Sequence, residues 1–94
     1  MIGFTFGNIF LTFNNDMFDS ILNNLFLDLE IKCLTKENKF RFVDSFMDNY
    51  LIYLEPIFED YFDLNIKEND IDKDELNLIF NEFEEYLDWI LKNK

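Results

Sequence analysis

The chain has 94 residues, of which 49% are hydrophobic and 19% aromatic, and it carries a formal net charge of −12 with no histidine. A composition this apolar excludes intrinsic disorder in spite of the charge, and a chain of this length is enough for one domain that buries roughly 60% of its unfolded surface. We therefore expect a single acidic domain over residues 1–94, with a core supplied mainly by its 13 Phe side chains.

The cysteine content and the apolar segments bear on the cellular compartment. The single cysteine, Cys33, excludes an internal disulfide framework and fits a reducing cytosol. We expect it to be a small buried apolar group. The first fifteen residues contain no Lys or Arg and no small-residue cleavage site, unlike a signal peptide, and no apolar run approaches the length of about 18 residues that a membrane span needs. The sequence thus predicts a cytoplasmic protein that does not bind membranes.

The N-terminal segment is predicted to form two short strands, Ile2 to Phe6 and Ile9 to Phe13. Gly7 and Asn8 form a two-residue turn signal between segments rich in Phe, Ile and Thr. The apolar residues do not alternate cleanly, so an extended arm laid across the helices is the competing interpretation. Because an isolated two-stranded hairpin is marginal in water, either form must pack on the rest of the chain.

The first helix is expected to follow the capping residues 14–16 and to end near Leu34, because apolar residues recur at helical spacing as far as Cys33. Thr35 is an N-cap candidate for the next helix, which would begin at Lys36 after a tight connection. Basic residues cluster around this connection, but the negative charge of the rest of the chain opposes nucleic acid, so we interpret them as solvated. They are Lys32, Lys36, Lys39 and Arg41.

This second helix is expected to include the segment from Phe40 to Phe62, and the proline within it, Pro56, should kink the helix or start a new one. One side of this helix carries apolar residues at three- and four-residue steps and should face the core. Those residues are Phe40, Val43, Met47, Tyr50, Leu54, Ile57, Phe58 and Tyr61. Another side carries a stripe of carboxylates, namely Asp44, Asp48, Glu55, Glu59 and Asp63.

The polar segment from Asn65 to Asp74 is the longest predicted loop. Asp72 and Glu75 have the spacing of a capping box at the start of the last helix, on which Trp89 should lie at the edge of the core. The elements together predict a mainly α fold. It is a small three- to four-helix bundle with a short N-terminal β-hairpin or extended arm packed against it.

The sequence carries no recognisable catalytic or metal-binding motif. Asp70, Asp72 and Asp74 have the spacing of the first EF-hand ligands, but Glu75 stands where a glycine is required and Asn81 where a bidentate Glu is required. Without histidine and with one cysteine, a transition-metal site is not expected. The sequence has no phosphate-binding glycine loop and no Ser-His-Asp set. We therefore expect a protein that is not an enzyme and that has no metal or cofactor.

The acidic surface is the remaining functional feature. The loop and last helix can widen the stripe into a patch with Asp70, Asp72, Asp74, Glu75, Glu82, Glu84, Glu85 and Asp88. The residues predicted to contact a partner are Asp44, Asp48, Glu55, Glu59, Asp63, Asp70, Asp72, Asp74, Glu82 and Glu85, together with Tyr53. Tyr50, Tyr61 and Tyr86 are further candidates for exposed aromatic anchors. The competing interpretation is that these acids only keep an aromatic-rich domain soluble.

Small, rigid and strongly acidic proteins suit the inhibition of basic targets, because their field speeds association with a basic cleft. We therefore predict an inhibitor of a basic, nucleic-acid-binding protein. It would be an immunity protein or antitoxin against a nuclease toxin, or a phage-encoded inhibitor of a defence nuclease such as a CRISPR effector. The profile is similar in kind to small acidic helical bacteriocin immunity proteins, with no shared motif. Direct binding of nucleic acid is not expected, and the chain should be a monomer or homodimer.

Two alternatives stay open on the sequence. In one, the surplus of aromatic residues forms a subunit or adaptor interface, and the protein is an oligomerising or adaptor module without inhibitory activity. In the other, the acidic loop makes the protein responsive to calcium. Sedimentation would test the first alternative, and a thermal melt with and without calcium would test the second.

Overall fold

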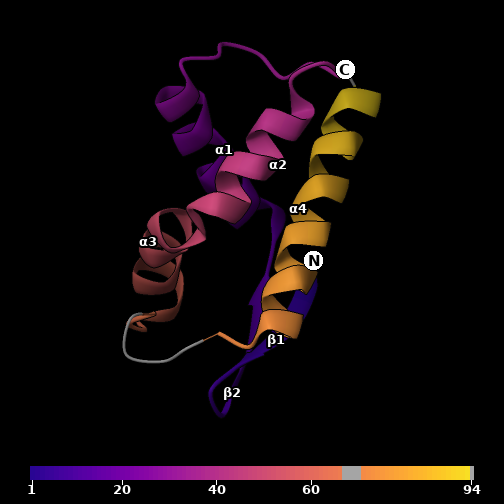
Figure 1. Ribbon diagram of the computed structural model, residues 1–94. Helices are drawn as coiled ribbons and strands as arrows, with labels where there is room; N and C mark the ends of the chain where they lie inside the picture. Colours follow the sequence, from indigo (N-terminus) through magenta and orange to yellow (C-terminus); the bar gives the residue numbers. More distant parts are fainter. Residues whose placement is uncertain (67–70, 94) are drawn as a thin grey trace.

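The computed structural model describes residues 1–66 and 71–93. Within these ranges a two-stranded hairpin is followed by four helices, which confirms the predicted fold class (Figure 1). The elements are β1 (Ile2–Phe6), β2 (Ile9–Phe13), α1 (Asn15–Leu29), α2 (Lys39–Asp48), α3 (Tyr50–Phe62) and α4 (Lys73–Lys92). No helix in these ranges is both long and apolar enough to cross a membrane.

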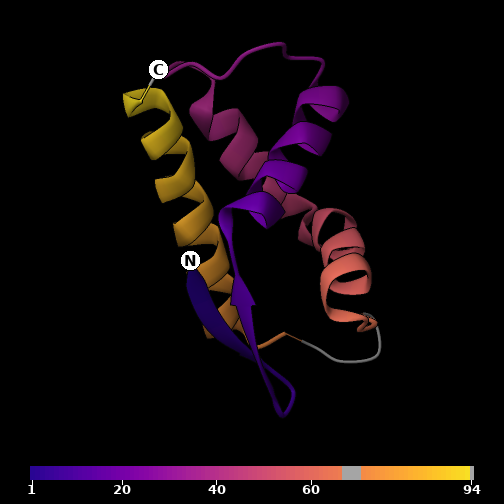
Figure 2. The ribbon, with the colours of Figure 1, turned by 180° about the vertical axis from the view of Figure 1, so that it is seen from behind.

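Helix α4 forms one long side of the molecule, and both β1 and α2 pack against it. Helix α3 lies across the molecule from α4 (Figure 1). In the view from behind, α1 and α2 cross each other at one end, while the hairpin runs beside the first half of α4 (Figure 2). The molecule is therefore longer in one direction, with extents of 38 × 22 × 21 Å.

The N-terminal hairpin is an antiparallel pair in which Ile2 lies opposite Phe13, as the strand prediction requires. Gly7 has a positive φ of 60°, which suits the first position of a two-residue hairpin turn. The side chains of β1 alternate between the core and the solvent. Phe10 of β2 points to the solvent, and its ring covers Gly3, where an added Cβ would lie 2.2 Å from the ring carbon Cζ.

Side chains of both α3 and α4 hold the hairpin in place. The ring of Phe58 lies 6.0 Å from that of Phe4 and 4.8 Å from that of Phe6. The backbone N–H of Thr5 donates a hydrogen bond of 3.1 Å to the carboxylate of Glu75. Asp72 caps α4 by accepting a hydrogen bond from the N–H of Asp74 at 3.0 Å. The predicted capping box is thus half formed, because the carboxylate of Glu75 binds the hairpin.

Helix α1 ends five residues earlier than predicted. Glu30 adopts a left-handed conformation with φ of 56°, and its N–H donates to the carbonyl of Leu27. The connection to α2 spans residues 30–38, in which Thr35 and Asn38 exchange side-chain to backbone hydrogen bonds of 2.7 and 3.2 Å. Cys33 lies in this connection and is exposed, so the prediction of a buried thiol was wrong. The helical spacing of apolar residues continues past the point where the left-handed cap stops the helix.

The predicted second helix is two helices, because the chain leaves helical geometry at Asn49. Both the backbone N–H and the side-chain amide of Asn49 donate to the carbonyl of Ser45, at 3.1 and 3.3 Å. An asparagine side chain that competes for backbone groups is a recognised way to end a helix. Pro56 lies inside α3, so the break occurs before the proline and not at it.

The break changes which side chains reach the core. Helix α2 buries Phe42 and Phe46 and leaves Phe40 and Met47 exposed, contrary to the prediction of one continuous core face. In α3, Tyr61 is also exposed, and Tyr50 is half-buried. The prediction was correct for Val43, Leu54, Ile57 and Phe58. The spacing of apolar residues predicts one buried face only for a single helix, and it fails here because the segment forms two helices with different directions.

Eight phenylalanine rings with less than 2% exposure form most of the core, as the composition predicts. Phe46 of α2 packs edge-on against two rings of α4, at 5.3 Å from Phe80 and 4.9 Å from Phe83. The eight rings are those of Phe4, Phe6, Phe13, Phe18, Phe42, Phe46, Phe58 and Phe83. They come from both strands and all four helices described, so every one of these elements is anchored by at least one ring.

Candidate functional site

The acids predicted to form one stripe lie on two helices. Asp44 and Asp48 are exposed on α2. Glu59 and Asp63 are exposed on α3 and at its C-cap, and Glu55 is half-exposed. Because the chain changes direction between α2 and α3 (Figure 1), these residues form two short sets and not the continuous row that the sequence predicts.

The next group of predicted contact acids is found around the start of α4. Asp70 lies outside the described residues. Asp72 and Asp74 are exposed at the N-cap and in the first turn of α4, where carboxylates stabilise the positive end of the helix dipole. No group of three or more Cys, Asp or Glu side chains in residues 1–66 and 71–93 is arranged to hold a metal ion.

Tyr53 was predicted as an aromatic contact for a partner, and the structure contradicts its exposure. Its side chain is buried in the core face of α3, with 5% exposure, and its hydroxyl donates to Asp28 of α1 at 2.7 Å. Burial, reinforced by the hydrogen bond to this carboxylate, raises the pKa of Tyr53 to about 12. Tyr53 therefore joins α3 to α1 and is not a surface anchor.

Two predicted contact residues, Glu82 and Glu85, line the same groove between α1 and α4. Asn15 and Phe18 of α1 line the opposite wall, and Tyr86 and Trp89 complete the α4 side. The groove has a volume of about 280 Å³. We call it the α1–α4 groove.

Three aromatic rings lead from the core to this groove. The rings of Phe18 and Tyr86 are stacked at 5.8 Å with an interplanar angle of 25°, and those of Tyr86 and Trp89 at 6.0 Å and 20°. Trp89 is the outermost ring and is 55% exposed. Sequence reasoning placed it only at the edge of the core. Its spacing of four residues from Glu85 is the signal that could have placed it beside the acids.

Two more carboxylates lie beside the groove, on α1. The hydroxyl of Tyr86 donates to the carboxylate of Asp19. Burial is the largest cause of the raised pKa of Tyr86. The hydrogen bond to Asp19 and the negative charges of Asp19 and Asp16 raise this pKa further. Asp16 and Asp19 were not predicted as contact residues, because their closeness to Tyr86 depends on how α1 packs on α4. The arrangement joins an exposed aromatic face to carboxylates from two helices, which is suited to binding a cation.

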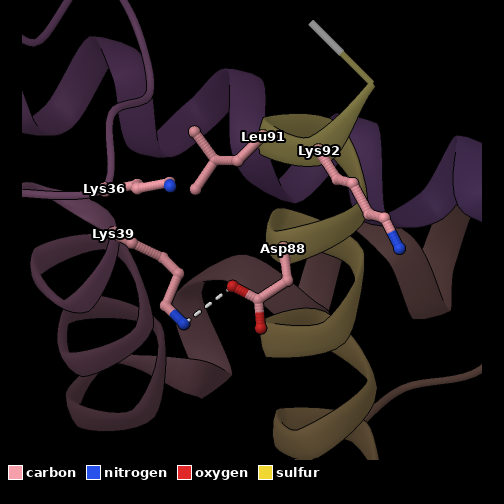
Figure 3. A pocket seen from close by; sticks show the side chains of 5 residues that line it. All are labelled: Lys36, Lys39, Asp88, Leu91 and Lys92. Atoms are coloured by element: carbon pink, nitrogen blue, oxygen red, sulfur yellow. Dashed lines mark hydrogen bonds and ion pairs between the residues drawn. The ribbon is translucent and has the colours of Figure 1, made fainter.

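A second hollow, of about 520 Å³, has a different chemistry and lies between the C-terminal end of α4 and the residues at the start of α2 (Figure 3). Lys39 reaches across it to Asp88 at 2.8 Å and to Glu84 at 3.5 Å. The hydrogen bond to Asp88 is the largest cause of a raised pKa of Lys39. The lysines of the hollow are Lys36, Lys39 and Lys92. Lys39 thus partly neutralises two acids of the predicted patch, Glu84 and Asp88, and it pairs with neither Glu82 nor Glu85.

Comparison of the chain with protein-family models, with curated proteins and with solved structures gave no match.

Proposed function

We propose that this protein binds a basic, nucleic-acid-binding protein and blocks it stoichiometrically. An immunity protein or antitoxin against a nuclease toxin, or a phage-encoded inhibitor of a defence nuclease, has this action. The observation that carries the proposal is the α1–α4 groove, which Glu82 and Glu85 of α4 line together with the rings of Tyr86 and Trp89, and where Asp19 of α1 accepts the hydroxyl of Tyr86.

The charge and the scaffold support the same function. A net charge of −12 on 94 residues creates a long-range field that attracts basic surfaces and speeds association. The Phe-rich core holds α1 and α4 together, so the carboxylates of the groove are positioned before a partner arrives. An exposed tryptophan is the residue type that most often anchors a protein interface.

The test is capture of the partner from the native host, followed by an assay of that partner. The native protein is compared with two double charge-reversal variants. One is Glu82→Lys with Glu85→Lys, and the other is Asp44→Lys with Asp48→Lys. A matched control reverses two exposed acids outside the predicted set, Glu37→Lys with Asp60→Lys. Circular dichroism establishes that each variant is folded.

We expect the native protein to capture a basic nucleic-acid-binding protein and to inhibit it at a one-to-one ratio. Reversal of Glu82 and Glu85 should weaken binding by at least about tenfold, added salt should weaken it further, and the control pair should have the smallest effect. An affinity that neither salt nor the reversals change would refute an electrostatic mode of binding. Capture of a protein without affinity for nucleic acid would refute the proposed class of target.

An oligomerising or adaptor module is the second candidate, and one observation favours it. Four large apolar side chains on α2 and the first turn of α3 are exposed. They are Phe40 at 58%, Met47 at 44%, Leu51 at 44% and Ile52 at 64%. Against self-association, each copy carries a charge of −12, and the two copies would repel each other. Sedimentation tests this candidate, which requires a concentration-dependent dimer that Phe40→Ser with Met47→Ser abolishes.

A further inference from the structure

We infer that the α1–α4 groove recognises an arginine side chain of the partner. This inference rests on the proposed function and specifies its chemistry, because it names the group that the groove accepts. It is argued from the faces of the aromatic rings, the positions of the carboxylates and the size of the groove.

The exposed ring of Trp89 supplies a planar surface for the guanidinium. Its inner face stacks on Tyr86, which in turn stacks on Phe18, so the tryptophan is supported from the core outward. A cation is attracted to the face of a tryptophan more strongly than to any other side-chain ring. Arginine uses this attraction best, since its planar guanidinium can stack on the ring while its N–H groups point outward.

The carboxylates lie where those N–H groups need acceptors. Glu82, Glu85 and Trp89 follow one another at steps of three and four residues on α4, and they line the same groove. A carboxylate can accept two parallel N–H bonds from one guanidinium. The carboxylate of Asp19 accepts the hydroxyl of Tyr86 and is a third acidic group close to the ring stack.

The size and charge of the groove select one occupant. Its volume of about 280 Å³ is enough to hold a single side chain. Its carboxylates repel anions and acidic peptides. A lysine ammonium would be attracted by the charge, but it is a compact ion that cannot stack and fork as a guanidinium does.

The experiment uses Trp89 as its own reporter, because it is the single tryptophan of the chain. The folded protein is titrated with a capped tetra-arginine peptide and with a tetra-lysine peptide of equal charge, and tryptophan fluorescence and calorimetry are recorded. We expect the arginine peptide to change the fluorescence and to bind at least about threefold more tightly than the lysine peptide.

Three variants locate the binding. The double variant Glu82→Gln with Glu85→Gln should bind the arginine peptide about tenfold more weakly than the native protein does. Glu37→Gln with Asp60→Asn makes the same change of charge at two exposed acids outside the predicted contact set and should have a much smaller effect. Trp89→Leu, followed by calorimetry, should abolish the preference for arginine over lysine while leaving weak binding of both peptides.

The outcomes separate this inference from the proposed function. Equal binding of the two peptides, with equal losses in the two double variants, would overturn the arginine site while leaving a general acidic surface in place. Absence of any arginine-peptide binding would also overturn it. The inhibitor proposal is judged independently by the captured partner and its inhibition.

Discussion

Tyr86 of α4 donates its phenolic hydrogen to the carboxylate of Asp19 on α1, and this bond connects the aromatic core to the α1–α4 groove. The ring of Tyr86 is 8% exposed and stacks between Phe18 on the core side and Trp89 on the solvent side. One residue therefore holds two helices together and positions the exposed tryptophan. A change at Tyr86 should affect both the stability of the fold and the geometry of the groove.

Replacing Tyr86 by phenylalanine keeps the ring and removes the hydrogen bond to Asp19. We expect the free energy of unfolding to fall by about 1 kcal/mol, the usual net value of such a bond, and the melting temperature to fall by about 4–8 °C. Urea unfolding and a thermal melt measure these changes. Tyr61→Phe is the matched control, because Tyr61 is 46% exposed, and it should have almost no effect. Equal stability of Tyr86→Phe and the native protein would contradict the structural role of the bond.

The two buried tyrosines make stability depend on pH in the alkaline range. The pKa of Tyr53 is raised from 10.0 to about 12 in the folded protein, and that of Tyr86 is raised as well. The folded state therefore holds these protons more tightly than the unfolded state does. This contribution to stability is complete below pH 10.0, the unfolded pKa, and is lost as the pH rises towards about 12. The raised pKa of Lys39 acts in the same direction.

We expect the melting temperature to fall steadily between about pH 10 and pH 12. Tyrosinate absorbance should show that Tyr53 and Tyr86 ionise well above pH 10.0 in the folded protein. Thermal melts across this range measure the effect, and the double variant Tyr53→Phe with Tyr86→Phe should show a shallower decline. A melting temperature that is constant up to about pH 12 would show that these protons are not linked to folding.

The sequence predicts the fold well where the structural signals are local. Gly7 and Asn8 mark the hairpin turn, and Asn14 and Asp72 mark the starts of α1 and α4. The helix ends were less predictable. Glu30 adopts the left-handed conformation usually found at glycine, and Asn49 divides what appears in the sequence as one helix. Apolar spacing carries no information on such stops, because it continues past them.

The candidate site depends more on tertiary packing, and the sequence predicts less of it. Glu82 and Glu85 were predicted because they lie on a strongly acidic helix. Asp16 and Asp19 could not be placed near Tyr86, because 67 residues separate Asp19 from Tyr86 and only the packing of α1 on α4 brings them together. Tyr53 was misplaced for the same reason, since its burial depends on the helical phase after Asn49.

Cys33 should react readily in the folded protein, because it is exposed in the connection between α1 and α2. We expect a thiol reagent such as a maleimide or an aromatic disulfide to label it at a rate similar to that in denaturant. Labelling that requires unfolding would mean that the thiol is buried, as the sequence alone predicts. The single cysteine makes the measurement unambiguous, and a Cys33→Ser variant supplies the blank.

Two phenylalanine positions should respond very differently to replacement by alanine. The ring of Phe83 has no exposed surface and lies 4.9 Å from Phe46 and 5.9 Å from Phe18. Phe83→Ala removes these contacts and leaves a cavity where α1, α2 and α4 meet. This change should lower the free energy of unfolding by about 3–5 kcal/mol. Since a domain of this size has a total stability of roughly 5–15 kcal/mol, the variant should be partly unfolded at room temperature or close to it.

Phe10 is the matched control, because its ring is 71% exposed on the outer face of the hairpin and covers Gly3. Phe10→Ala removes the same side chain and should lower the free energy of unfolding by less than about 1 kcal/mol, because little apolar surface is lost from the interior. Urea unfolding of both variants gives the comparison. Similar losses at the two positions would mean that the hairpin face carrying Phe10 is buried in solution, by a second copy or by rearrangement of the hairpin, and the exposed face described above would then be wrong.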